Sequence, residues 1–317
     1  MAAVEPTSNP PKALDVMARV VRHIVMVALM LAASAPVGCQ WRERGVGAAS
    51  RQASDDYPWP RSNAAYDPLA ARLPTPRGFR RVPLERGSWG DWLRHLPLLP
   101  RGSPVTSHRD DLVMPGDFPA LAAVADLDVR KNQECADTIL RLRAEYLRQA
   151  GRDREIVFKA ANGEAISWGR WKGGMRPHSD GRRLWSTRDA RPDASRASFD
   201  RFLDAVFTWC GTYSLAQEGT AASITDARVG DFFVHPGNPG HAVLIVDLAR
   251  NDSGRTRALL LEGYMPAQSA HILARARGLP WFDLDPERPL YTPVWGGRFR
   301  ATELRRFVDN SVSRTSR

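Results

Sequence analysis

The chain has 317 residues, of which 43% are hydrophobic and 25% charged. This composition is typical of a globular protein and excludes a disordered or fibrous chain. The formal net charge is +10, yet only four of the 45 basic residues are lysine and the arginines are spread along the whole chain. A nucleic-acid site gathers its cations on one element, so we expect no nucleic-acid partner.

The first forty residues have the features of a secretory leader. Basic residues precede an apolar run at 24–31, and small residues lead from there to Val37-Gly38-Cys39. A charged start, a short apolar run and small residues before a cut are typical of a signal peptide. The run is too short to span a bilayer comfortably, although a plain transmembrane anchor is the alternative. We therefore expect residues 1–38 to be a signal peptide.

Val37-Gly38-Cys39 resembles the lipobox of bacterial lipoproteins. The resemblance implies cleavage before Cys39, a diacylglycerol on its thiol and a further acyl chain such as palmitate on its amino group, which together suffice for stable membrane anchoring. Gln40 stands where Asp retains enteric lipoproteins in the inner membrane, so we expect the outer membrane, facing the periplasm. The polar, aperiodic residues 39–65 are predicted to tether one α+β domain, residues 66–317.

The first half of this domain contains helical and hairpin patterns. Ser88 is placed to cap a short helix, and residues 133–149 carry an apolar stripe at helical spacing. Asn162-Gly163 between two short apolar runs predicts a β-hairpin. Residues 173–195, rich in Gly, Pro, Ser, Asp and Arg, are expected to form a loop, and residues 198–209 a second helix.

Strands dominate the second half. Residues 229–234 and 241–247 are largely apolar, and Asn251-Asp252-Ser253-Gly254 predicts a turn that returns the chain through residues 258–262. Helices first and a run of antiparallel strands afterwards indicate an α+β fold class.

Cys135 and His241 are the candidates for nucleophilic catalysis. Cys135 begins the predicted 133–149 helix, where unpaired backbone N–H groups and the helix dipole favour a thiolate. His241 opens an apolar strand directly after Gly240, so we expect its imidazole to face a groove. A thiol and an imidazole are two parts of a cysteine acyl-transfer enzyme, and a third group must orient the imidazole.

Glu262 is the candidate for this third group. If the turn is centred between Asp252 and Ser253, Glu262 lies opposite Val243, on the same sheet face as His241. Asp247 shares that face but lies roughly 20 Å along the strand from His241, which excludes it as a direct partner.

A Cys-led helix is followed by VGDFFV at 229–234 and by GHAVLIVD at 240–247. This order resembles the NlpC-like and CHAP branch of papain-like cysteine peptidases and amidases. The resemblance implies a papain-like arrangement with the Cys-bearing helix packed on an antiparallel sheet. It makes Cys135 the nucleophile, His241 the base and Glu262 the orienting residue. By the same analogy Gln133 adds an oxyanion donor to the backbone N–H of Cys135.

Further motifs narrow the resemblance: QECAD at 133–137, GTYSL at 211–215, GHA at 240–242 and YMPAQ at 264–268. Together they resemble a bacterial lipoprotein family catalogued as domain of unknown function 4846. The likeness spans nearly all of residues 65–310 and brings no established activity. The family usually has glutamine at position 262 and an aliphatic or small residue at position 210. The third catalytic residue therefore stays open, and a disulfide between Cys135 and Cys210, conceivable in an oxidising envelope, is not required.

We expect a hydrolase of the cell envelope that acts on peptidoglycan peptides or acyl groups, with Gln268 as a candidate substrate contact. The sequence has no glycine-rich nucleotide loop and no metal motif, so we expect no cofactor. A zinc site from Cys135, His235 and His241 lacks a standard ligand spacing, and His235 and His271 are interpreted as loop or surface groups. The alternative is a non-catalytic binding or structural lipoprotein with a buried thiol, since free cysteines are commonly buried.

Overall fold

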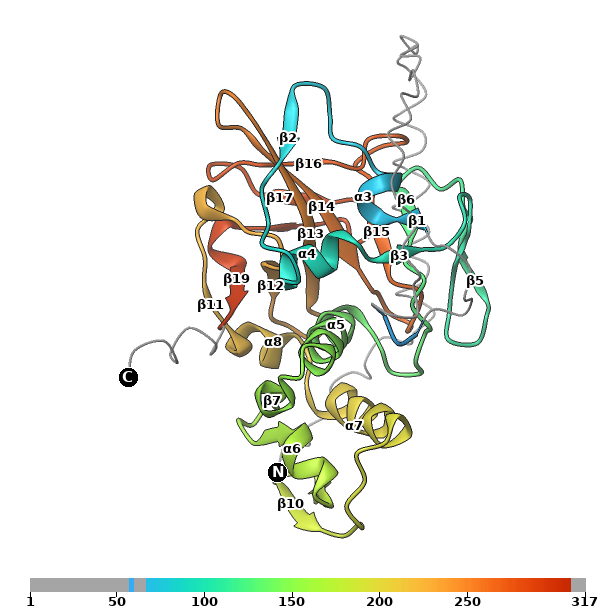
Figure 1. The fold of residues 1–317 in the computed structure, drawn as a ribbon, viewed down its shortest axis with the longest axis vertical. Coiled ribbons are helices and arrows are strands. Elements are labelled where there is room, and N and C mark those ends of the chain that lie inside the picture. Colours follow the sequence, from blue (N-terminus) through green and yellow to red (C-terminus); the bar gives the residue numbers. More distant parts are fainter. Residues whose placement is uncertain (1–56, 60–66, 309–317) are drawn as a thin grey trace, which may run out of the picture. The chain divides into compact units, whose positions relative to one another are not determined.

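The computed structural model describes residues 57–59 and 67–308, drawn in colour in Figure 1. The predicted signal peptide, residues 1–38, and all but three residues of the predicted tether, residues 39–65, lie outside the described residues. Within the described part of the chain, no helix is both long and apolar enough to cross a bilayer.

A nine-stranded antiparallel sheet forms the centre of the described structure. Its strands are β2 (Phe79–Arg81), β6 (Leu121–Val124), β11 (Gly219–Ala221), β12 (Phe232–His235), β13 (His241–Asn251), β14 (Thr256–Glu262), β15 (His271–Leu273), β16 (Phe282–Leu284) and β19 (Leu304–Phe307). The main path runs β11-β19-β12-β13-β14-β15-β6, while β2 pairs with β13 and β16 pairs with β14. β13 is the longest strand and is buried along its first nine residues, which explains its nearly continuous apolar sequence.

Ten further strands of the described residues form five antiparallel pairs outside this sheet. They are β1 (Asp67–Pro68) with β3 (Pro97–Leu98), β4 (Val105–Thr106) with β5 (Leu112–Met114), β7 (Val157–Lys159) with β8 (Ala165–Ser167), β9 (Met175–Ser179) with β10 (Leu184–Arg188), and β17 (Leu290–Thr292) with β18 (Gly297–Phe299). The hairpin predicted around Asn162-Gly163 is confirmed as β7 and β8.

The helices are α3 (Leu69–Arg72), α4 (Trp89–Arg94), α5 (Cys135–Gln149), α6 (Trp168–Lys172), α7 (Arg196–Trp209) and α8 (Thr212–Glu218), with the short 3₁₀ turns η2 (Asp153–Glu155), η3 (Ile224–Asp226) and η4 (Ala301–Glu303). The three predicted helices are confirmed as α4, α5 and α7. The hydroxyl of Ser88 caps α4 by accepting from the backbone N–H of Asp91. A capping box formed by Glu134 and Asp137 starts α5.

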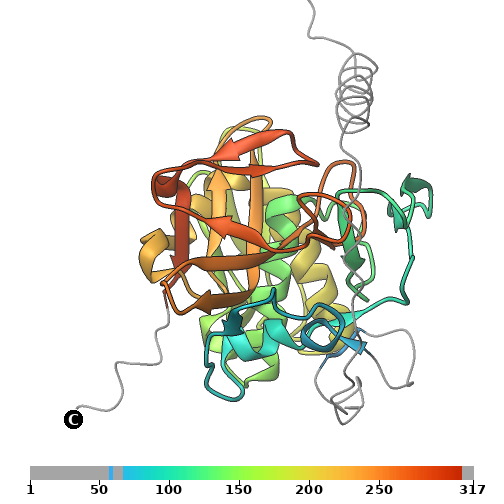
Figure 2. The same ribbon diagram turned by 90° about the horizontal axis from the view of Figure 1, so that it is seen from above.

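The helices and the sheet share one hydrophobic core. α4 and α5 lie against β13, and α7 lies against α5. Figure 1 shows α5, α6 and α7 together below the sheet, and Figure 2 shows the orange and red strands of the second half grouped beside them. The first turn of α5 therefore lies next to the central strands.

The predicted α+β, papain-like arrangement was wrong. The described chain is mainly antiparallel sheet, with 31% strand and 24% helix, and the described residues show no papain-like packing of the Cys-bearing helix. The resemblance rested on short motifs that specify single strands. It could not show which strands pair, because β2, β6, β11 and β19 come from distant parts of the chain and join the same sheet.

The loop predicted at residues 173–195 was also wrong, because it contains the β9–β10 hairpin. The side chains of these two strands are at least partly exposed, so no apolar alternation marks them in the sequence. Asp180 forms the turn by accepting from the backbone N–H groups of Arg182 and Arg183, and Gly181 adopts a φ of 85°.

Candidate functional site

Four titratable side chains lie in a row across four adjacent strands at one end of the sheet. His235 on β12 pairs with His241 on β13, and Glu262 on β14 pairs with His271 on β15. Directly opposed residues of antiparallel strands point to the same face. The pairing of Leu244 with Leu261 continues to Glu262 opposite Val243, which puts all four side chains on one face.

The predicted register between β13 and β14 is confirmed at this end of the hairpin. Near the turn the pairing is displaced by one residue from the prediction, as Ala249 opposite Arg257 shows. An irregularity between Ile245 and Asp247 inserts an extra residue into β13 and restores the predicted pairing beyond it. Without this bulge, the side chain of Glu262 would not share the face of His241.

His241 is bound to Glu262 inside the protein. Its Nε2 lies 2.8 Å from Oε2 of Glu262, and the two side chains are 1% and 0% exposed. The imidazole is enclosed by the rings of Tyr264, Trp295 and Phe299, whose centroids lie 5.2, 5.0 and 6.0 Å from its own. No sequence pattern marks Trp295 as a neighbour of His241, since it lies in the distant turn between β17 and β18.

Glu262 also contacts His271, which the sequence analysis assigned to a loop or the surface. His271 is instead fully buried on β15, with Nε2 3.3 Å from Oε1 of Glu262 and Nδ1 3.0 Å from the carbonyl oxygen of Ser269. Burial by itself raises the pKa of Glu262, but its interactions with the neighbouring imidazoles of His241 and His271 outweigh burial, so the pKa lies below its usual value. One feature of the sequence could have indicated this burial: His271 is the first residue of an apolar strand, as His241 is.

Cys135 is the first residue of α5 and is 6% exposed. Its sulfur lies beside the backbone N–H groups of Ala136 and Ala242, the latter following His241 directly. Burial, with the nearby charge of Asp137, nevertheless raises the pKa of the Cys135 thiol to about 12. The lowered pKa expected at a helix start was therefore wrong, because burial outweighs the helix-end effect and Asp137 and Glu134 add acidic groups there.

Gly263 lets the start of α5 approach the end of β14. A Cβ at Gly263 would lie 2.4 Å from Oγ1 of Thr138 and 2.8 Å from the backbone oxygen of Glu134. We expect Gly263→Ala to lower the free energy of unfolding by about 1–3 kcal/mol, because the added Cβ forces the buried Thr138 side chain and the backbone at Glu134 to shift. Urea unfolding measures the effect. Gly169→Ala is the control, since its Cβ meets only an ordinary contact at 3.6 Å, and an equal loss there would contradict the close approach.

Tyr264 covers the cluster from outside. It is half-buried, and burial together with the charges of Glu262 and Cys135 raises the pKa of its phenol to about 12. Tyr264 and Trp295 are both partly exposed, whereas His241, Glu262 and His271 are buried. Tyr264 and Trp295 are thus two partly exposed rings that contact the buried imidazole of His241.

The two glutamines predicted near the site lie in different surroundings. Gln133 is fully buried, and its amide joins Thr138 to Arg141: Nε2 donates to Oγ1 of Thr138 at 3.3 Å and Oε1 accepts from Arg141 at 2.5 Å. This bonding gives the amide a structural role that competes with oxyanion binding. Gln268 is 1% exposed, and its Oε1 has no hydrogen-bond partner among the described residues.

The remaining predictions concern thiols and metals. Cys135 and Cys210 are both buried and free, so they form no disulfide. The described residues contain no group of three or more His, Cys, Asp or Glu side chains arranged to hold a metal. His235 is half-exposed and bonds through Nδ1 to Oε1 of Glu303 at 2.7 Å, close to Trp295 rather than to a metal ligand set.

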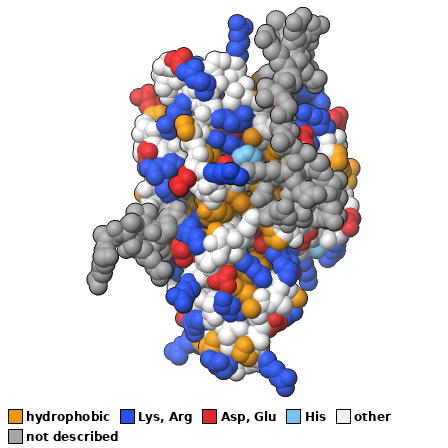
Figure 3. All heavy atoms as spheres, in the orientation of Figure 1, with side chains coloured by type: hydrophobic (Ala, Val, Ile, Leu, Met, Phe, Trp, Pro, Cys, Tyr) orange, Lys and Arg blue, Asp and Glu red, His pale blue; other side chains and the backbone are white. Residues whose placement is uncertain are grey.

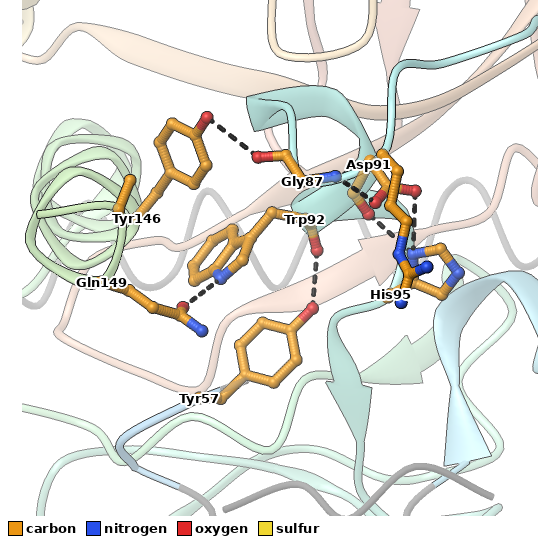
Figure 4. A pocket seen from close by; sticks show the side chains of 9 residues that line it. Tyr57, Gly87, Asp91, Trp92, His95, Tyr146 and Gln149 are labelled. Carbon is orange, nitrogen blue, oxygen red and sulfur yellow. Dashed lines mark hydrogen bonds and ion pairs between the residues drawn. The ribbon is translucent and has the colours of Figure 1, made fainter. Parts of the chain in front are cut away.

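Two cavities lie away from this cluster. One of about 230 Å³ is lined by Tyr57, Trp92, Tyr146 and neighbouring residues at the far end of α5 (Figure 4). There the hydroxyl of Tyr57 donates to the carbonyl of Trp92 and the indole of Trp92 to Gln149, so its polar groups bond to one another. A larger groove of about 810 Å³ lies beside Arg250, at the opposite end of β13 from His241.

The described residues on the face seen in Figure 3 form no single basic patch. Lys and Arg side chains are scattered over the face seen in Figure 3, among apolar and uncharged groups. Neither cavity contains Cys135, His241 or Glu262. Cys135, His241 and Glu262 therefore lie away from both cavities, and the expectation that the imidazole of His241 faces a groove was wrong, because this side chain is buried.

Comparison with known proteins gives one match. The searches of curated proteins and of solved structures found no match to the chain. The model of the family described as Domain of unknown function (4846) matches residues 69–306, a range that includes α5, β13, β14 and β15. The chain therefore belongs to the domain of unknown function 4846 family.

Proposed function

We propose that the protein is a cysteine hydrolase in which Cys135 is the nucleophile, His241 the general base and Glu262 the group that orients His241. The observation that carries the proposal is the buried hydrogen bond of 2.8 Å between Nε2 of His241 and Oε2 of Glu262. The next residue after His241 is Ala242, whose backbone N–H lies beside the sulfur of Cys135. Nucleophile, base and orienting group are the three parts of covalent acyl-transfer catalysis.

The hydrogen bond to Glu262 selects the tautomer of His241. An ionised carboxylate only accepts hydrogen bonds, so Nε2 of His241 carries the proton and Nδ1 has the free lone pair. In the proposed reaction Nδ1 takes the thiol proton while the sulfur attacks the carbonyl carbon of an amide or ester. The imidazolium then protonates the leaving nitrogen or oxygen, which leaves a thioester on Cys135. Water, deprotonated by His241, hydrolyses the thioester and releases the acid.

The raised pKa of Cys135 requires this base. At pH 7 a thiol with a pKa of about 12 is ionised to only about one part in 10⁵. The cysteine is thus neutral before reaction, and proton transfer to His241 accompanies attack. The backbone N–H of Cys135 has no partner within α5, because it lies in the first turn, and is available to stabilise the oxyanion.

The leader sequence supports a place for this reaction in the cell envelope. We propose a protein anchored through lipidated Cys39, in the outer membrane and facing the periplasm, where peptidoglycan peptides and acylated polymers offer amide and ester bonds. Cys39 lies outside the described residues, so this part of the proposal rests on the sequence: the apolar run at 24–31, Val37-Gly38-Cys39 and Gln40.

Burial supports a second function, that of a non-catalytic envelope binding protein. Cys135 is 6% exposed and His241 1% exposed, which is also usual for structural core residues. The two functions differ in one observable respect. Only the hydrolase forms an acyl group on Cys135 that depends on His241.

An acyl-trapping experiment separates these functions. The full chain is incubated with p-nitrophenyl acetate between about pH 6 and 9, and the acetylated peptides are mapped by mass spectrometry. We expect acetylation of Cys135, its loss in His241→Gln and no acetylation of the buried Cys210. Absence of acetyl-Cys135 throughout this range, or acetylation unchanged in His241→Gln, would overturn the hydrolase and favour the binding protein.

A further inference from the structure

His271 is the buried residue of the cluster to which the proposed reaction gives no role. It pairs with Glu262 across β14 and β15, and both side chains are 0% exposed. The carboxylate of Glu262 lies between the two imidazoles, with Oε2 on His241 and Oε1 on His271. In the described residues no Lys or Arg forms an ion pair with Glu262.

The contacts of His271 determine how many protons it holds. Its Nδ1 lies 3.0 Å from the carbonyl oxygen of Ser269, which can only accept, so Nδ1 carries a proton. Its Nε2 lies 3.3 Å from Oε1 of Glu262. In a neutral His271 the Nε2 lone pair would face the carboxylate lone pairs in a buried site, which is repulsive. A proton on Nε2 turns this repulsion into attraction at ion-pair distance, without an aligned hydrogen bond between the two atoms, and gives the pair no net charge.

This proton keeps the whole cluster electrically neutral. The bond to Oε2 places a proton on Nε2 of His241, and once His271 balances the charge of Glu262 no second proton on Nδ1 is needed for neutrality. No other nearby group supplies a positive charge in place of His271. The neighbouring acidic groups all have raised pKa values: Cys135, Tyr264, Asp137 and Glu134. His235 is paired with Glu303. Neutrality matters because an uncompensated charge in the interior is costly.

We infer that His271 is a positioning residue, which compensates the charge of Glu262 and so keeps His241 an uncharged base. Its catalytic meaning rests on the proposed function, since it acts through His241 and touches no reacting atom. Without His271 the buried carboxylate has only His241 to neutralise it. His241 then binds a proton on Nδ1 as well, and an imidazolium cannot accept the proton of Cys135.

The test follows the histidine ring nitrogens of the full chain by NMR after ¹⁵N-histidine labelling. At pH 7 we expect His241 as the neutral Nε2–H tautomer and His271 with a proton at each nitrogen or shared with Glu262. In His271→Gln, the titration midpoint of His241 is expected to rise by about 1–3 pH units, the usual effect of a nearby opposite charge. Acetylation of Cys135 at pH 7 should fall at least tenfold and recover at higher pH.

Two further variants test whether the effect of His271 on His241 depends on the charge of Glu262. Glu262→Gln added to His271→Gln removes the uncompensated carboxylate, so the midpoint of His241 should return toward the wild-type value. His235→Gln is the matched control, since this half-exposed histidine is paired with Glu303 and should leave the midpoint unchanged. A purely structural His271 would affect stability in all His271 variants without moving the midpoint.

The wild-type spectrum decides the inference even if His271→Gln fails to fold. A His271 protonated at Nδ1 only, with a free Nε2 lone pair at pH 7, overturns it. An unshifted midpoint in a folded His271→Gln overturns it as well. If the spectra agree with the inference but wild-type Cys135 is never acetylated, the proposed function fails while the charge compensation by His271 stands.

Discussion

Replacing Cys135 with alanine is expected to reduce hydrolysis by at least about 10³-fold in kcat/KM, because no other group of the cluster can form the acyl intermediate. The measurement compares the turnover of p-nitrophenyl esters and of peptidoglycan stem peptides by the full-length wild type and variant. The substitution leaves the bond between His241 and Glu262 in place, so the loss reports on the nucleophile.

Cys210→Ala is the matched control for this prediction. Cys210 is also free and buried, and burial likewise raises the pKa of its thiol well above the usual value. It follows the last residue of α7 and belongs to the hydrophobic core rather than to the cluster. We expect turnover to be retained in Cys210→Ala. Equal turnover in Cys135→Ala and the wild type would exclude a nucleophilic role for Cys135.

The largest effect on stability is expected at Asp247. Its fully buried carboxylate accepts from Nε of Arg81 at 2.6 Å and from Nε of Arg94 at 2.7 Å, and thereby ties β13 to β2 and α4. Asp247→Ala leaves both guanidinium groups without their carboxylate. Removal of one partner from a buried ion pair costs about 3–5 kcal/mol, a large fraction of the 5–15 kcal/mol typical of a folded domain.

Guanidinium chloride unfolding measures this loss, with Asp252→Ala as the control. Asp252 lies in the turn after the same strand and pairs with Arg80, but both side chains are largely exposed, at 80% and 77%. Exposed pairs contribute about 0–1 kcal/mol, so we expect Asp252→Ala to be nearly neutral. If Asp247→Ala cost no more than Asp252→Ala, the buried network would not hold these elements together.

Part of the candidate site could be found from the sequence because its residues mark the ends of regular elements. Cys135 starts a periodic helix and His241 starts an apolar strand. Glu262 was placed by counting residue pairs from the turn of the hairpin. The predicted pairing is correct near His241 because the bulge in β13 cancels the one-residue displacement near the turn. That compensation was not visible in the sequence, since bulges depend on how the whole sheet pairs.

His271 and Trp295 could not be assigned to the site in this way. His271 reaches Glu262 only because β15 pairs with β14, and Trp295 reaches His241 only because the β17–β18 turn folds over β13. Both contacts join residues with no local pattern between them. The burial that raises the pKa of Cys135 likewise results from packing around the start of α5, whereas helix position alone predicted a lowered value.

The sequence by itself determined the local elements: the capped helix α5, the hairpins at Asn162-Gly163 and residues 251–254, and the apolar strand β13. These follow from periodicity, caps and turn residues, which act between near neighbours. Only the tertiary structure decided the strand order of the sheet, the burial of the cluster and the place of Glu262 between two histidines. Those features depend on pairing between distant strands, whose energy comes from backbone bonds and packing that no short motif encodes.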